Sequence, residues 1–158
     1  MSASGAPIRF AGSELRENRH VCAFFRTSDE EYRVLLPFIR DGFERGERAF
    51  HIVDGALRQN HRTHLLGAGL DVDTAERSGQ FELRAWEEAY LRGGHFDQNA
   101  MLGLISEVLD AGPALGFPLT RLVAHMEWAL EDRPGVDDLL EYETRLNFLL
   151  PQYDDAVI

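Results

Sequence analysis

The amino-acid sequence predicts one α/β domain with an open, mostly parallel sheet of about five strands and helices on both faces. Three observations lead to this prediction. Short apolar runs alternate along the chain with longer segments whose apolar residues recur every three or four positions. The longer segments can act as crossovers between parallel strands. A length of 158 residues suits a single hydrophobic core.

The first strand is expected at residues 20–25 (HVCAFF), after a polar lead-in over residues 1–18. Its nearly continuous apolar run indicates a central strand that is covered on both faces. Ser28 opens an S-x-x-E capping box, so a helix is expected to begin there and to end at Gly46. Pro37 is expected to kink this helix.

The rest of the domain, which spans residues 19–158, repeats the alternation of strands and helices. Strands are predicted at 49–54, 80–86 and 120–128, and a last strand opens at 156–158. Helices are predicted at 57–66, after the capping residue Asp97, and at 136–150. Because the sequence ends inside the last strand, we expect either a strand that is cut short or a free-standing module.

The composition disfavours several classes of partner. Against 27 Asp and Glu there are 16 Lys and Arg, which gives a net charge of −11. Binding to nucleic acids or to anionic membranes rewards clustered cations, so neither is expected. The single Cys22 cannot form an intrachain disulfide, and neither a signal peptide nor an 18-residue apolar run is found. A cytoplasmic location is therefore expected.

The predicted binding residues lie near the strand ends, because open α/β sheets bind ligands beyond the carboxyl ends of their strands. Aromatic walls with a few polar groups suit a small, mostly apolar ligand. The alternative is that the rings complete the core and that Asp54 caps the following helix. The candidate ligand-binding residues are Phe24, Phe25, Arg26, Asp54, Trp86, Tyr90, His125, Glu127 and Trp128.

His125 and Glu127 are two positions apart, so they are expected on one face of a buried strand. Burial would raise the pKa of Glu127 unless the carboxylate had a partner. The pair could serve as an acid and a base or hold a polar ligand group, or it could simply fix the strand by a hydrogen bond. No metal site is assigned, although His20, Cys22 and His51 are possible soft ligands.

Five other polar residues are not among the candidate ligand-binding residues. Glu143 and Asn147 are four positions apart in the last predicted helix, where they could tie the helix to a loop or reach the cleft. His61, His64 and His95 lie in polar surroundings and are expected at the surface.

Several catalytic and nucleotide-binding motifs are missing from the sequence. It has no G-x-S-x-G, H-E-x-x-H, G-x-G-x-x-G or G-x-x-x-x-G-K-[ST] pattern. The segment after the first predicted strand, 26–31 (RTSDEE), has three acids where a phosphate loop needs glycines and a lysine. We therefore expect no ATP binding, no cofactor and no catalysis.

Four segments together resemble the MEDS family, the sensory domain of methanogens and methylotrophs named after a dichloromethane-responsive regulator. They are residues 20–54, the stretch with Gln80, Trp86 and Tyr90, residues 120–130 (TRLVAHMEWAL) and residues 142–147 (YETRLN). The resemblance runs from about residue 18 to the C-terminus. It implies a sensory domain for small hydrocarbon derivatives that works beside transcription regulators or histidine kinases.

The resemblance also implies a pseudo-ATPase scaffold, with a sheet like that of the RecA/KaiC-type ATPases but without the phosphate loop. Asp54 and Glu127 would then lie near the ends of the catalytic-acid and Walker-B strands. The predicted function is a non-catalytic sensory domain with a kinase or transcription-regulator partner. The alternatives are a protein-interaction module without a small ligand and an enzyme that uses His125 and Glu127.

Overall fold

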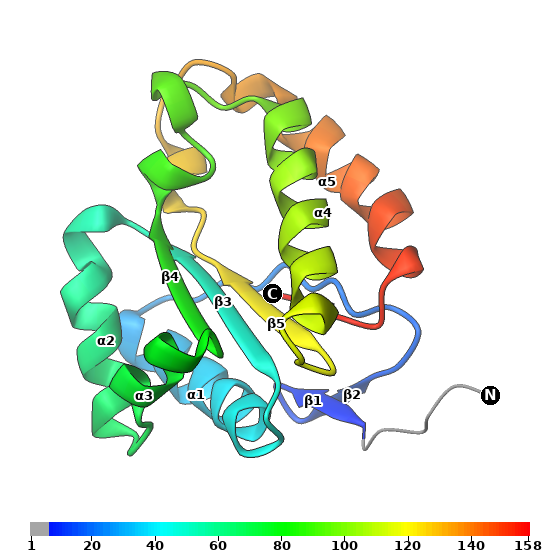
Figure 1. Ribbon diagram of the computed structural model, residues 1–158. Helices are drawn as coiled ribbons and strands as arrows, with labels where there is room; N and C mark the ends of the chain where they lie inside the picture. Colours follow the sequence, from blue (N-terminus) through cyan, green and yellow to red (C-terminus); the bar gives the residue numbers. More distant parts are fainter. Residues whose placement is uncertain (1–6) are drawn as a thin grey trace.

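A four-stranded parallel sheet forms the centre of the computed structural model, which describes residues 7–158 (Figure 1). The strand order is β4-β3-β5-β6, with β3 and β5 inside the sheet. The strands are β3 (Arg48–Val53), β4 (Phe81–Ala85), β5 (Thr120–Ala124) and β6 (Ala156–Val157). The α/β prediction is confirmed, with four parallel strands where about five were expected.

Helices cover both faces of this sheet. In Figure 1, α4 and α5 lie on one side of the strands, and α1, α2 and α3 lie on the other. The helices are α1 (Ser28–Glu44), α2 (Arg58–Gly67), α3 (Val72–Ser78), α4 (Gln98–Ala114) and α5 (Leu139–Leu149). Within residues 7–158, no helix has the length and apolar character needed to cross a membrane.

The sheet separates two apolar cores. All six residues of β3 are buried, and successive side chains point to opposite faces of the strand. Phe50 and Ile52 pack in the core beneath α4 and α5, whereas Ala49 packs in the core on the α1 side. Leu122 and Val123 of β5 divide between the cores in the same way.

The first predicted strand is wrong as a central strand. Residues 20–25 run along the outer edge of β6, where they form a single parallel bridge between His20 and Val157. The backbone N–H of Val21 donates to the carbonyl oxygen of Val157 at 2.9 Å, and no further bridge is formed by this segment. Phe24 is 90% exposed. The apolar run is therefore an edge segment, and β3 is the strand that is covered on both faces.

The strand predicted at 120–128 ends early, at Ala124. The chain then leaves the sheet and forms a short 3-10 helix, η4 (Glu127–Leu130). His125 and Glu127 therefore do not lie on one face of a strand, and the expectation based on that spacing is wrong.

The predicted lead-in contains a hairpin that the sequence analysis did not anticipate. Its strands are β1 (Ile8–Phe10) and β2 (Ser13–Leu15), which pair antiparallel. Ile8, Phe10 and Leu15 are buried in the core on the α1 side. Part of the predicted lead-in, residues 1–6, lies outside the described residues.

The capping residue of α1 lies one position earlier than the capping pattern predicted. Thr27 is the capping residue, and its hydroxyl oxygen accepts from the backbone N–H of Glu30 at 3.2 Å. The Glu30 carboxylate in turn accepts from the backbone N–H of Arg26 at 2.8 Å. These bonds fix the first turn, which carries Glu31, and the helix continues across Pro37.

A buried arginine ties α1 to β5. The guanidinium of Arg121 donates to Glu47 at 2.5 Å, to Asp41 at 2.6 Å and to the carbonyl oxygen of Phe38 at 2.6 Å. Removing one partner of such a buried ion pair destabilises the fold strongly, so this network fixes the position of the helix relative to the strand. It thereby positions residues of α1 against residues that follow β5.

Candidate functional site

A cavity of about 430 Å³ lies at the carboxyl ends of β3, β5 and β6. Val53, Val123 and Val157 form part of its wall on the sheet, and Leu35 lines it from α1. Residues 20–28, which include the edge segment, border the same space. The cavity is thus at the edge of the sheet where open α/β proteins bind their ligands.

Six of the nine candidate residues border this cavity. They are Phe24, Phe25, Arg26, Tyr90, His125 and Glu127. These residues differ in their exposure to solvent. His125 is buried, Phe25 is half-buried, and Phe24 and Arg26 are exposed. The structure therefore brings residues of the edge segment and residues that follow β5 to one place.

Asp54 and Trp86 have structural contacts instead. The Asp54 carboxylate accepts from the backbone N–H of Ala56 at 2.9 Å and caps the short 3-10 helix η1 (Gly55–Leu57). The ring N–H of Trp86 donates to the carbonyl oxygen of His125 at 2.8 Å. Trp86 therefore helps to fix the backbone of His125 without bordering the cavity.

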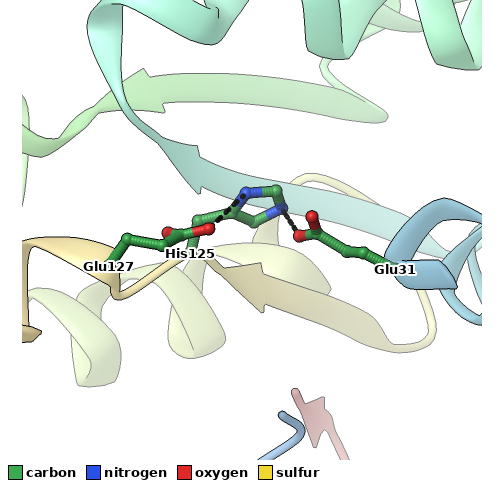
Figure 2. Close-up of side chains that lie close together, drawn as sticks. All are labelled: Glu31, His125 and Glu127. Atoms are coloured by element: carbon green, nitrogen blue, oxygen red, sulfur yellow. Dashed lines mark ion pairs between the residues drawn. The ribbon is translucent and has the colours of Figure 1, made fainter. Parts of the chain in front are cut away.

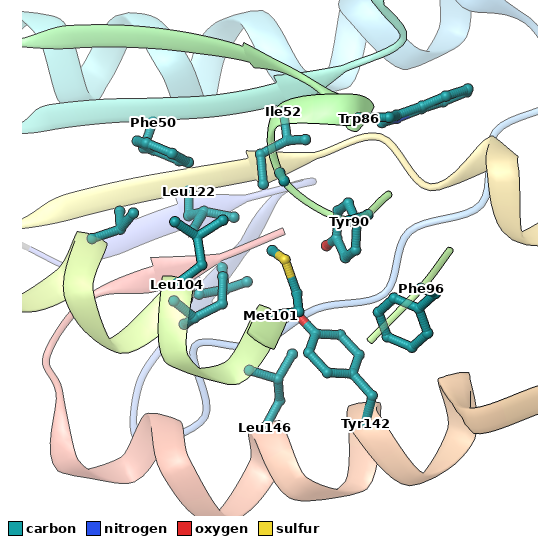
Figure 3. Packing of buried hydrophobic residues seen from close by; sticks show 14 of the residues in the cluster. Phe50, Ile52, Trp86, Tyr90, Phe96, Met101, Leu104, Leu122, Tyr142 and Leu146 are labelled. Atoms are coloured by element: carbon teal, nitrogen blue, oxygen red, sulfur yellow. The ribbon is translucent and has the colours of Figure 1, made fainter. Parts of the chain in front are cut away.

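The expectation that Trp86, Tyr90 and Trp128 line one cleft is wrong for the two tryptophans. Trp128 is fully buried, and its ring lies 5.1 Å from that of Tyr90 and 5.0 Å from that of Phe96. Figure 3 shows Trp86, Tyr90 and Phe96 within the core beneath α4 and α5. Tyr90 alone of the three also borders the cavity. All three rings belong to the core beneath α4 and α5.

Glu31, His125 and Glu127 form a cluster of titratable side chains at the cavity (Figure 2). Nε2 of His125 lies 3.2 Å from Oε1 of Glu31, and Nδ1 lies 4.0 Å from Oε1 of Glu127. The two carboxylates approach the imidazole ring from different sides. Glu31 comes from the first turn of α1, whereas the other two residues follow β5.

Burial changes the acidity of two members of this cluster. The pKa of Glu31 is raised to about 7, first by burial and then by the negative charge of Glu127. Burial lowers the pKa of His125, an effect that the Glu127 carboxylate partly opposes. The side chain of Glu127 is 55% exposed, so the prediction that this residue is buried is wrong.

A chain of buried hydrogen bonds runs from α1 to β3 beside this cluster. The hydroxyl of Tyr32 lies 2.7 Å from Nδ1 of His61, and Nε2 of His61 lies 2.8 Å from Nδ1 of His51. His61 has no exposed surface, so its predicted surface location is wrong. Its pKa is lowered to about 3, mainly by burial and then by neighbouring histidines. Burial therefore favours the neutral form of both His61 and His51.

His20 is tied to the last helix rather than to His51. Its Nδ1 lies 3.0 Å from Oδ1 of Asn147, and its Nε2 lies 3.2 Å from Oε2 of Glu143. Of the two alternatives for Glu143 and Asn147, the first is therefore confirmed for both residues, which tie the helix to the loop that carries His20. Glu143 also borders the cavity.

Sequence reasoning missed Glu31, Tyr32 and His61 as residues of this region. Glu31 was explained as a capping residue, and His61 lies in a helix whose sequence is largely polar. The position of the first predicted helix could nevertheless have identified Glu31 and Tyr32. The N-terminus of a crossover helix and the carboxyl ends of parallel strands lie at the same edge of a sheet, so residues 26–32 could have been added to the candidates.

The arrangement combines an apolar cavity with a localised polar cluster. Valine and leucine side chains can contact the body of a small molecule, while Glu31 and His125 can bind a single polar group at one side. Glu127 adds a partly exposed negative charge beside them.

Comparisons with known proteins agree with this picture at the level of the family. The profile of the MEDS family, described as "MEthanogen/methylotroph, DcmR Sensory domain", matches residues 19–158. The chain is also 24% identical over 144 residues to the transcriptional repressor DcmR of Methylorubrum extorquens. That alignment covers 91% of this chain and 51% of the relative, so the chain spans about half of the repressor's length. No solved structure shows significant similarity. Because the profile covers nearly the whole chain, the protein belongs to the MEDS family of sensory domains.

Proposed function

We propose that this domain binds one small, mostly apolar molecule in the cavity at the carboxyl ends of β3, β5 and β6. Binding would be signalled to a transcription-regulator or kinase partner, without catalysis by the domain itself. The observation that carries the proposal is the cavity of about 430 Å³, whose size falls in the range typical of small-molecule sites.

The border of the cavity supports an apolar ligand. Phe24, Leu57 and Leu130 are large, exposed hydrophobic side chains, and all three border this one cavity. Exposed apolar groups that gather around a concave site are typical of a binding surface. A hydrocarbon derivative with one polar group would contact these side chains and place that group near Glu31 and His125.

The regulatory role is supported by the family and by the similar repressor. Since the chain spans about half of that repressor, the partner that receives the signal is part of the proposal. The parallel order β4-β3-β5-β6, with helices on both faces, is compatible with the RecA/KaiC-like scaffold expected from the sequence. That scaffold likewise belongs to the proposal.

The binding proposal can be tested with 1-hexanol, which combines an apolar chain with one hydroxyl. Methyl NMR signals of Leu35, Val53 and Val123 should shift saturably in a metal-free buffer that contains a chelator. We expect a Kd of about 1 mM or tighter, which is about 0.6 kcal/mol per non-hydrogen atom of the probe.

A matched pair of substitutions tests the location. Ala23 is half-buried and borders the cavity, so Ala23→Phe should narrow the space and weaken binding at least about tenfold. Ala100→Phe places the same ring at an exposed site on α4 and should leave the affinity unchanged. The proposal fails if 1-hexanol causes no saturable shift, or if folded Ala23→Phe binds like the wild type.

A protein-interaction module is the second candidate. Leu140 and Phe148 are exposed on α5, and the net charge of −11 would favour a basic partner. This candidate predicts partner binding that weakens strongly with salt and does not change when 1-hexanol is added.

A further inference from the structure

We infer that Glu31, His125 and Glu127 bind one divalent transition-metal cation at the wall of the cavity. The three residues come from the first turn of α1 and from the segment that follows β5 (Figure 2). One ligand atom from each residue can be chosen so that all three atoms lie within 4.8 Å of one another. The metal site does not depend on the proposed organic ligand, although a cation here would hold that ligand's polar group.

The spacing between Glu31 and His125 suits two ligands of one cation. Nε2 of His125 and Oε1 of Glu31 are 3.2 Å apart. Two atoms that each lie about 2.1 Å from a metal, at tetrahedral or octahedral angles, are about 3.0–3.4 Å apart. The observed separation therefore leaves room for a cation bound to both atoms.

The imidazole supplies the second, independent observation. The His125 side chain is only 7% exposed, and Nε2 is a buried atom without a hydrogen-bond partner among the described residues. Its separation from Glu31 is short, but the two groups do not have the geometry of a hydrogen bond. A buried polar atom without a partner is rare in folded proteins. A metal ion would satisfy the lone pair of this nitrogen and one lone pair of Glu31 together.

Glu127 can complete the set from the open side. Its carboxylate oxygen lies 4.0 Å from Nδ1 of His125, and its side chain is more than half exposed. It can therefore rotate toward the cation without disturbing packed atoms. With both carboxylates ionised, as metal binding requires, they and a neutral imidazole carry a charge of about −2, which matches a divalent ion.

The surrounding charges also favour a cation. Glu143 is a third carboxylate at the cavity, and Arg26 is the one arginine among the described residues that border it. The chain has no lysine. Imidazole together with carboxylate suits Zn²⁺, Fe²⁺ or Mn²⁺, whereas Mg²⁺ prefers oxygen ligands alone. Three protein ligands would leave a coordination position open toward the cavity.

The test is a calorimetric titration of the full 158-residue chain with Zn²⁺, after removal of metals by a chelator and without any organic ligand. We expect one Zn²⁺ per chain and at least about hundredfold weaker binding of Mg²⁺. Glu31→Gln and His125→Asn should each weaken Zn²⁺ binding at least about tenfold, and Glu127→Gln should weaken it less. The exposed controls Glu107→Gln and His95→Gln should bind like the wild type.

A second measurement separates this site from other possible ligands. Co²⁺ bound at the proposed site should show d–d absorption without a thiolate charge-transfer band, and Cys22→Ala should leave binding unchanged. If His125→Asn does not fold, the two glutamate variants carry the test. The inference is overturned if Zn²⁺ does not bind, if folded Glu31→Gln binds it normally, or if Cys22→Ala abolishes binding. Because the 1-hexanol titration is metal-free, the two proposals can fail separately.

Discussion

The buried histidine of β3 makes the stability of this domain depend on pH in a way that one substitution can isolate. His51 has no exposed surface, and its pKa is lowered well below its usual value, mainly by burial and then by His61 and His125. A histidine whose pKa is lower in the folded state stabilises the fold fully above its unfolded pKa, about 6.5. This contribution is lost as the pH falls below that value.

The size of the loss follows from the neutral state of His51. Each pH unit below about 6.5 costs about 1.4 kcal/mol while the folded state excludes the proton, so the loss at pH 5.0 is at most about 2 kcal/mol. His51→Asn keeps an amide near the position of Nδ1, which faces His61, but it removes the titrating group. The variant is expected to be less stable than the wild type at pH 8, because a packed ring is lost. That deficit should shrink at pH 5.0, by at most about 2 kcal/mol.

Urea unfolding of the wild type and of His51→Asn at both pH values measures how the stability deficit of the variant changes with pH. All four curves use the same spectroscopic signal and a buffer that contains a chelator. Groups that do not interact with His51 titrate equally in both proteins and cancel in the comparison. A deficit that is the same at pH 8 and pH 5.0 would show that the folded state does not disfavour protonation of His51. It would mean that His51 accepts a proton in the folded state, or that burial does not suppress its charge.

Three further outcomes follow from particular side chains. Trp128→Ala should lower the free energy of unfolding by about 3–5 kcal/mol in urea, because the ring is fully buried, whereas Phe24→Ala at an exposed ring should change it by less than about 0.5 kcal/mol. Burial raises the pKa of Asp155 to about 6, so its carboxylate lowers the stability increasingly from about pH 4 and fully above about pH 6. In unfolding curves, Asp155→Asn should therefore gain about 1 kcal/mol over the wild type between pH 4 and pH 7, after allowance for partial exposure. Calorimetric titration with Mg-ATP should be flat, because residues 26–31 hold three acids and no lysine, and micromolar binding would contradict this expectation.

The fold could be predicted from the sequence where a pattern had one interpretation. The strands now seen as β3 (Arg48–Val53) and β4 (Phe81–Ala85) were expected within a residue at each end, and Asp97 caps α4 as predicted. Residues 20–25 were misplaced because an apolar run does not reveal whether a neighbouring strand exists on each side. Only the tertiary structure shows that this segment has one neighbour and that Phe24 faces solvent.

The candidate site could be predicted in its location but not in its composition. The strand-end rule led to His125, Glu127 and the edge segment, which border the cavity. The rule could not separate the tryptophans, because their burial depends on how η2 (Trp86–Glu88) and η4 fold back over the core. Nor could periodicity reveal His61, whose burial results from the packing of α2 against its neighbours.

Intermolecular NMR contacts show directly where a small molecule binds to this domain. With ¹³C-methyl-labelled protein and 1-hexanol, we predict nuclear Overhauser effects from the alkyl chain to the methyl groups of Val53, Val123 and Leu35. These contacts should disappear in Ala23→Phe. If 1-hexanol contacts the exposed Leu140 of α5 instead, the cavity is not its binding site. The absence of contacts to the cavity methyl groups at saturating 1-hexanol would lead to the same conclusion.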